Sequence, residues 1–202
     1  MAIAGDGRTG EHTLSLPEGL VLCLVRERPT YGLVLARLLA PDSSLGQIWS
    51  VPKAMVYYAL QQLALAGLIR MTREQRTSQG PARSIYRITP AGRAAAEAWV
   101  SRPVEHIRDV RSELMIKLAL NDRTGVDSRP LVRAQLAQLV PIAAGLDDRL
   151  RAAEGFERTL ALWRYEAMTA TMQFLRALAD SRVGASRGRP DPAGLRRSDR
   201  ES

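Results

Sequence analysis

The sequence is poor in the residue types that most catalytic and metal-binding sites require. Its 202 residues include a single cysteine, Cys23, and only two histidines, His12 and His106. One cysteine excludes an intramolecular disulfide and fits a reducing cytoplasm. No cluster of Cys, His and acidic residues has the spacing of metal ligands, and no nucleophile is paired with a base. We therefore expect no enzyme, no catalytic residue, no metal and no cofactor.

The chain also lacks an apolar run long enough to cross a membrane. Its N-terminal stretch MAIAGDGRTGEH has no apolar segment of the kind found in signal peptides. Hydrophobic residues make up 46% of the chain and charged residues 25%, which is enough for a core and ordinary for a folded domain. We predict a cytoplasmic protein without a membrane partner.

Residues 50–93 carry the most informative pattern in the chain. Ser50 is the expected N-cap of a helix that ends at Gly67, since glycine readily adopts the left-handed conformation after a helix. Two short β-prone segments, 68–71 and 84–88, then flank a polar tip. Apolar residues fall on one face of the helix: Val56, Ala59, Leu60 and Leu63. A helix followed by such a hairpin is typical of the winged form of the helix-turn-helix.

Positive charge is concentrated in the same region. From Lys53 to Arg93 there are seven basic residues and one acidic residue, whereas the whole chain has a net charge of +8. A solvated basic surface is the simplest explanation, but the helix also presents tyrosines and a glutamine opposite its apolar face. Such a surface suits phosphate neutralisation and contact with base edges. The candidate DNA-binding residues are Lys53, Ala54, Tyr57, Tyr58 and Gln61 on the helix and Arg73, Arg76 and Arg83 near the hairpin tip.

Three further helices are expected around this region. One runs from Leu14 to Arg26, a second from Tyr31 to Leu39 with Thr30 as its cap, and a third begins with Pro90 after the cap residue Thr89. In the loop 41–50, Trp49 is expected to fill the core of the domain, with ligand stacking as the alternative role.

The second half of the chain predicts long packed helices. A helix from Val104 to Leu120 comes first, and two apolar seams with alternating spacings of four and three residues follow. Pro141 should kink or divide the first seam helix. The last helix has apolar residues on more than one side, which indicates cover by a second subunit. The candidate dimerisation residues are Phe156, Leu160, Trp163, Ala167 and Phe174.

These observations predict a mainly α fold with a small β-hairpin wing, divided into four parts. Residues 1–13 form a flexible N-terminal segment, and residues 14–102 a winged-helix DNA-binding domain. Residues 103–180 form a helical dimerisation domain. Residues 181–202, which contain six basic and three acidic residues, form a disordered basic tail.

Several short motifs resemble the PadR family of bacterial transcriptional regulators, over roughly residues 14–180. They are Tyr31-Gly32, Val56-Tyr57-Tyr58-Ala59-Leu60, Gly67-Leu68-Ile69, Gly80-Pro81-Ala82-Arg83 and Tyr86-Arg87-Ile88-Thr89-Pro90-Ala91-Gly92-Arg93. The resemblance implies a winged-helix domain with a C-terminal dimerisation domain, acting as a homodimeric repressor on inverted-repeat double-stranded DNA. It also leaves room for release by a small aromatic or apolar effector. The connection 41–51 and the uncharged Gln62 and Ala64 depart from the family pattern and leave the operator sequence open.

Two alternatives remain at this stage. The winged helix could be a protein-interaction module, although a wing that docks on protein should show apolar residues in place of arginines. Trp163 and Phe174 could border an effector cleft between the helical part and the winged helix. Core packing is the simpler role for aromatic residues at helical spacing.

Overall fold

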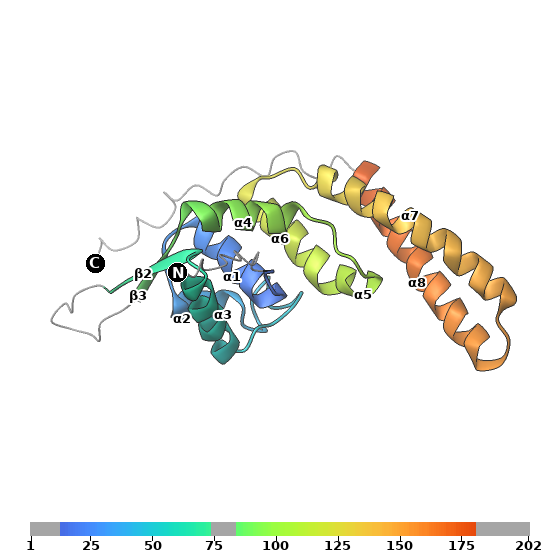
Figure 1. Cartoon of the computed structure of the whole chain (residues 1–202), viewed down its shortest axis with the longest axis horizontal. Helices are drawn as coiled ribbons and strands as arrows, with labels where there is room; N and C mark the ends of the chain where they lie inside the picture. The colour runs from blue at the N-terminus through green and yellow to red at the C-terminus, as the bar shows by residue number, and fades with distance from the viewer. Residues whose placement is uncertain (1–12, 74–83, 181–202) are drawn as a thin grey trace, which may run out of the picture.

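The chain folds into helices and one small antiparallel sheet, as its sequence predicts (Figure 1). The computed structural model describes residues 13–73 and 84–180. In the N-terminal half the elements are α1 (Leu16–Glu27), β1 (Thr30–Tyr31), α2 (Gly32–Leu38), α3 (Lys53–Leu65), β2 (Ile69–Arg73), β3 (Ser84–Ile88) and α4 (Pro90–Ser101). They are followed by α5 (Ile107–Asp109), the π-helical turn η1 (Val110–Leu114), α6 (Met115–Thr124), α7 (Arg129–Ala152) and α8 (Gly155–Asp180).

Helix α1 is the centre of the first core. Its residues from Leu20 to Val25 are all buried, because α3, α4, α6 and the sheet pack around it. Trp99 of α4 lies directly over Gly19, where a Cβ atom would come within 2.2 Å of the indole ring. Trp49 is half-buried against the same core, so its predicted packing role is confirmed. Only a glycine in α1 allows α4 to approach this closely.

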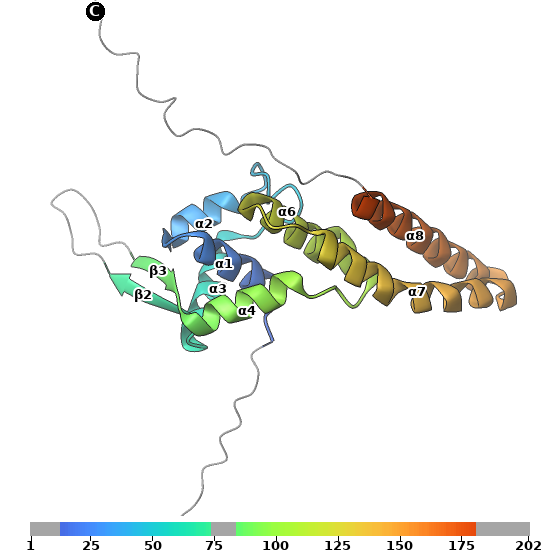
Figure 2. The ribbon, with the colours of Figure 1, turned by 90° about the horizontal axis from the view of Figure 1, so that it is seen from above.

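The sheet has the order β1-β3-β2, with antiparallel pairing throughout. Strands β2 and β3 pair along their full length, from Ile69 opposite Ile88 to Arg73 opposite Ser84. The two residues of β1 pair with Tyr86 and Ile85. This hairpin projects from the end of the molecule opposite α7 and α8 (Figures 1 and 2).

The structure confirms some of the predicted helix ends and shows that others are wrong. Gly67 has a φ of 69°, as expected after a helix, and the Thr89 hydroxyl accepts a hydrogen bond from Gly92 N–H. Ser50, however, is not the N-cap of α3, because the helix begins at Lys53 with Pro52 at the cap position. Thr30 does not cap α2 either, since its backbone is drawn into β1 by pairing with Tyr86.

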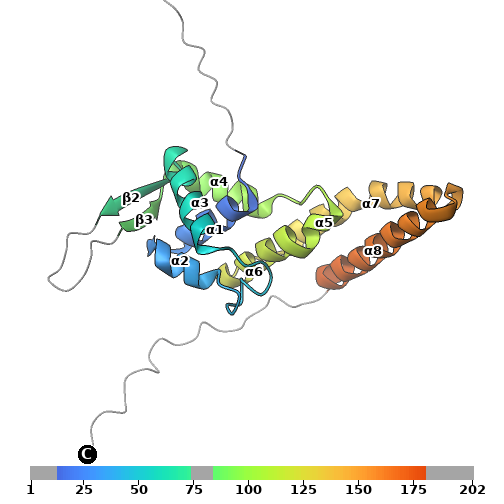
Figure 3. The same ribbon diagram turned by 90° about the horizontal axis from the view of Figure 1, so that it is seen from below.

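The C-terminal half is a helical hairpin preceded by a continuous helical segment that contains one π-helical turn. Segments α5, η1 and α6 follow one another without a break from Ile107 to Thr124, and α7 packs along α8. Helix α7 continues through Pro141, so the proline does not divide it. Side chains from η1, α7 and α8 form a second core that includes Leu114, Leu139 and Leu175. Figure 3 shows the α7–α8 hairpin extending away from the winged helix.

Polar contacts of Arg123 and Lys117 join the two halves, and those of Gln135 hold α7 against the segment that follows α4. The buried amide of Gln135 on α7 accepts a hydrogen bond from Val104 N–H at 2.7 Å and donates one to the Val104 carbonyl at 3.0 Å. Arg123 of α6 makes a two-pronged ion pair with Glu27 of α1, at 3.0 and 2.8 Å. The buried ammonium of Lys117 donates to the Arg102 carbonyl, pairs with Glu113 and lies 4.8 Å from the centre of the Trp99 ring.

Candidate nucleic-acid interface

Helix α3 has one buried face and one exposed face, as the periodicity predicts. Val56, Ala59, Leu60 and Leu63 are buried against the first core. The exposed face carries the five helix residues predicted for DNA binding: Lys53, Ala54, Tyr57, Tyr58 and Gln61. Tyr58 is 61% exposed and Tyr57 is 41% exposed. The exposed face thus presents hydroxyls, an amide and an ammonium, all of which can bind phosphate or base edges.

Tyr57 of α3 also lies against the start of α2 and near the wing strand β3. A Cβ atom on Gly32, the first residue of α2, would lie only 2.8 Å from Cε1 of Tyr57. Burial raises the pKa of the Tyr86 hydroxyl on β3, and Tyr57 contributes further to this rise. Tyr57 therefore packs over the start of α2 and faces the wing with its polar end. Its ring is a spacer between elements as well as a candidate DNA contact.

The wing places two arginines directly opposite each other. Arg70 of β2 is the cross-strand partner of Arg87 on β3, and both side chains are exposed. Residues opposite each other in an antiparallel pair point to the same face, so two positive charges are held side by side. Neither arginine makes an ion pair with any described residue. Like charges in this position destabilise a hairpin, whereas a shared anion would remove the repulsion.

The predicted tip residues are only partly within the structure. Arg73 is the last residue of β2, opposite Ser84 of β3. Arg76 and Arg83 lie outside the described residues. The predicted interface did not include Arg70 and Arg87, because their pairing depends on the register of the two strands. The length of the hairpin tip does not determine that register.

The described residues contain neither a metal centre nor a membrane-spanning helix. No group of three or more His, Cys, Asp or Glu side chains within residues 13–73 and 84–180 is arranged to hold a metal ion. Over the same residues, no helix combines the length and the apolar character needed to cross a bilayer.

A comparison with protein families decides the class of this winged helix. The model of the transcriptional regulator PadR-like family matches residues 21–98. These residues run from the buried part of α1 through α3 and the wing into α4. The winged-helix part of the chain is thus similar to the PadR-like family. No curated protein matches the chain.

Solved structures similar to the chain include three structures of two PadR-type proteins. Bacillus subtilis PadR in complex with operator DNA is 18% identical, with a TM-score of 0.43 over 82% of this chain and 98% of that one. The same protein in complex with p-coumaric acid is 18% identical, with a TM-score of 0.36 over 81% and 93%. The PadR-like transcriptional regulator BC1756 from Bacillus cereus is 18% identical, with a TM-score of 0.39 over 83% and 95%.

Outside residues 21–98, helix α8 exposes a row of large apolar side chains. Phe156 is 81% exposed, Trp163 is 67% exposed, and Leu160 and Phe174 are more than one-third exposed. The opposite face of α8 packs on α7 through Ala161, Met168, Met172 and Leu175. The predicted seam on α8, which also includes the half-buried Ala167, is therefore the outward face of the helix.

Proposed function

We propose that this protein is a sequence-specific DNA-binding transcriptional regulator that acts as a homodimeric repressor. The observation that carries the proposal is the exposed face of α3, where Lys53, Tyr57, Tyr58 and Gln61 lie beside a basic hairpin. An α-helix of this kind fits the major groove, where an amide such as that of Gln61 can pair with adenine.

The wing and the recognition helix would have different tasks on DNA. Arg73, Arg76 and Arg83 near the hairpin tip would bind phosphates or enter a minor groove, as would the exposed pair Arg70 and Arg87. Phosphate contacts fix the position of the protein and supply affinity that is independent of sequence. Gln61, by contrast, would distinguish one base pair from another.

The second part of the proposal is a twofold dimer formed through α8. The exposed row of Phe156, Leu160, Trp163 and Phe174, with Ala167 beside them, is a continuous apolar face on a long helix. A second copy of the chain offers a matching face of the same length. Because such a dimer presents two recognition helices, its operator should be an inverted repeat with half-sites roughly one or two helical turns apart.

The third part is release of DNA by a small aromatic or apolar effector. Trp163 and Phe174 are the α8 side chains on which an aromatic effector would stack. Packing against the second subunit competes with this role, because both residues lie in the proposed dimer face. If Trp163→Ala lost ligand binding but still formed the dimer, Trp163 would be assigned to the effector and not to the dimer interface.

The proposal is tested by binding of the full chain to the DNA upstream of its own gene. Fluorescence anisotropy over a salt series should give tight, sequence-dependent binding. The logarithm of the association constant should fall linearly with the logarithm of salt concentration. Scrambled DNA of the same composition should bind far more weakly. Equal and weak binding to both DNAs would instead favour the alternative, a winged helix that docks on another protein.

A further inference from the structure

A single helical segment takes part in both hydrophobic cores of the chain. Val110 and Leu114 of η1 are buried in the second core, beside α7 and α8. Ile116 and Leu120 of α6, only a few residues later, are buried in the first core. Because η1 and α6 follow each other without a break, the packing of α6 on the winged helix determines how the helical half is oriented.

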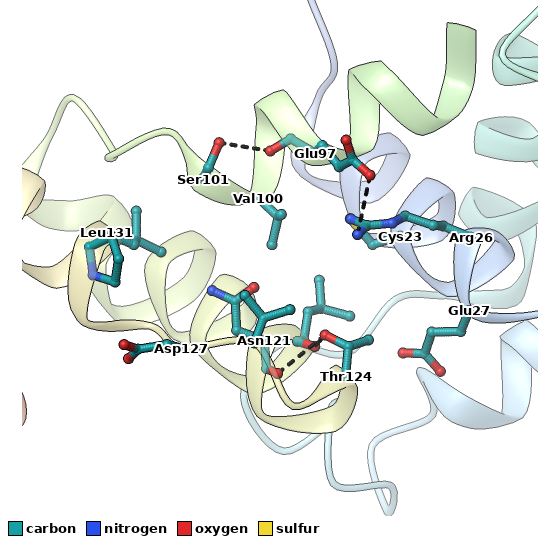
Figure 4. A pocket seen from close by; sticks show the side chains of 13 residues that line it. Cys23, Arg26, Glu27, Glu97, Val100, Ser101, Asn121, Thr124, Asp127 and Leu131 are labelled. Carbon is teal, nitrogen blue, oxygen red and sulfur yellow. Dashed lines mark hydrogen bonds and ion pairs between the residues drawn. The ribbon is translucent and has the colours of Figure 1, made fainter. Parts of the chain in front are cut away.

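Apolar packing fills only part of the joint between α6 and the winged helix. A cavity of about 520 Å³ lies between α1, α4, α6 and the segment that connects α6 to α7. Figure 4 shows this space, with Cys23 of α1, Val100 of α4 and Asn121 of α6 at its walls. Hydrophobic contact is non-directional, so helices beside an open space can shift against one another at little cost. Directional polar contacts are thus needed to hold α6 in one orientation.

Lys117 makes a deeply buried polar contact across this joint. Its side chain is 1% exposed, and its ammonium group donates a hydrogen bond to the Arg102 carbonyl at 2.8 Å. The same ammonium pairs with Glu113 at 2.7 Å and lies 4.8 Å from the centre of the Trp99 ring. Arg102 is the C-cap residue of α4, so the positive charge meets the negative end of that helix dipole. Lys117 therefore connects α6 to the last turn of α4.

The partners of Lys117 in the winged helix are themselves held firmly in place. Trp99 lies so close to Gly19 of α1 that a Cβ atom there would come within 2.2 Å of the indole ring. Helix α1 in turn packs on α3, which carries the candidate DNA contacts. The position of α6 is therefore tied, through α4 and α1, to the position of the recognition helix.

A buried lysine is not the most stable way to join two helices. Removing an ammonium group from water is unfavourable, and burial accordingly lowers the pKa of Lys117, although its hydrogen bond with Glu113 opposes this. Apolar side chains of similar volume often give equal or greater stability at such a site. A buried charge instead favours one geometry, because its hydrogen bonds and ion pair form in one arrangement and are lost in others.

We propose that Lys117 is a positioning residue, which fixes the angle at which the helical half leaves the winged helix. In a dimer formed through α8, this angle determines the half-site spacing of the operator. Helix α8 has 26 residues and is about 39 Å long, so a rotation of about 10° at the joint moves its far end by roughly 7 Å. Base pairs are about 3.4 Å apart, so this movement equals roughly two of them. The angle follows from the joint alone, and only its effect on spacing rests on the proposed function.

The distance between the two halves tests the angle without DNA. Spin labels on Ala98→Cys of α4 and Ala144→Cys of α7, both exposed positions, report this distance by double electron–electron resonance. An excess of unlabelled chain ensures that each dimer carries one labelled subunit. Cys23 stays unlabelled, because it is buried and burial raises the pKa of its thiol to about 12. We expect a narrow distance distribution in the parent and one at least about twice as broad in Lys117→Met.

Stability separates a positioning role from a purely structural one. Lys117→Met removes the charge and keeps the length of the side chain, so the urea midpoint of unfolding should be unchanged or higher. In Glu113→Gln the amide oxygen still accepts a hydrogen bond from Lys117 but no longer neutralises its charge. The midpoint should then fall while the distance distribution stays narrow. Arg151→Met is the matched control, because it removes an i,i+4 ion pair that lies within α7 and should leave the distribution unchanged.

Operators with altered spacers test the consequence for DNA binding. Each added base pair shifts and rotates one half-site, so the parent should bind its natural spacing about tenfold more tightly than spacings two base pairs longer or shorter. In Lys117→Met we expect this preference to fall below about threefold, because more arrangements of the two halves are populated. Affinity for a single half-site should be unchanged, since Lys117 lies on α6 and not on the recognition helix or the wing.

Three results would overturn the proposal. They are a parental distance distribution in Lys117→Met, loss of folding of this variant, and a parental spacing preference despite a broadened distribution. If the chain bound no operator at all, the proposed function would fail, whereas the distance measurements would still decide whether Lys117 fixes the angle.

Discussion

At the scale of single residues, Gln61 is the side chain with the most specific expected role. It is exposed on α3, four residues after Tyr57 and three after Tyr58, so the three share a face. We expect Gln61→Ala to lose about 1–3 kcal/mol of discrimination at one base position, measured by competition between operator variants. Gln62→Ala is the control, because its half-buried side chain points about 100° away. Discrimination equal to that of the parent would assign base recognition to other residues.

Gly32 offers a second test, because it leaves no room for a methyl group. The Tyr57 ring lies 2.8 Å from where its Cβ atom would be, so Gly32→Ala must displace the ring or α2. We expect the free energy of unfolding to fall by about 1–3 kcal/mol in urea titrations, with weaker operator binding. Gly145→Ala is the matched control in α7, where a Cβ atom meets nothing within 4 Å. That change should instead raise stability by about 0.5–1 kcal/mol, and a similar effect at both sites would contradict the packing argument.

At the scale of elements, the wing should be more stable without one of its arginines. Arg87→Gln removes the repulsion with Arg70 and should raise the free energy of unfolding by about 0.2–1 kcal/mol at low salt. The same variant should bind DNA more weakly and reduce the salt slope of binding by roughly one unit.

Neutralising Arg73, Arg76 or Arg83 should reduce the slope in the same way. Arg149→Gln, an exposed arginine of α7, should change neither quantity. An unchanged slope in all wing variants would exclude phosphate contacts.

The elements themselves were largely predictable, because local patterns determine most of them. Ser84–Ile88 forms a strand as predicted, and Gly67 and Thr89 bound their helices through local backbone chemistry. Strand β1 could not be predicted, because two residues form a strand only when tertiary packing brings β3 beside them. That Arg70 and Arg87 lie opposite each other could not be predicted from the sequence for the same reason. Neither could the cavity that contains Asn121. Both depend on how distant segments meet.

At the scale of the whole molecule, the proposed dimer depends on the exposed face of α8. The sequence predicted two apolar stripes on this helix, but only the structure shows that Met168 and Leu175 face α7 while Phe156 and Trp163 face outward. Periodicity alone cannot rank two stripes on one helix, since both satisfy the same spacing. The outward stripe is therefore the one available to a second subunit.

Leu160→Glu tests that assembly directly. In a dimer formed through α8, it would bury an unpaired carboxylate, at a cost of several kcal/mol. We expect monomers in analytical ultracentrifugation, or insoluble protein, and loss of operator affinity. Leu162→Glu makes the same change on another side of α8 and should leave the dimer intact. A soluble Leu160→Glu dimer with parental operator affinity would show that α8 is not the interface.

The two hydrogen bonds between the Gln135 side chain and the Val104 backbone should slow amide exchange in the linker. Val104 lies outside every helix and strand, yet its N–H is buried and bonded to a side chain of another element. Its proton can exchange with deuterated solvent only when α7 separates from the linker. We expect its exchange to be as slow as that of amides within α7, while exchange at the exposed His106 is fast. The exchange rate of that one proton would then report how often α7 separates from the linker.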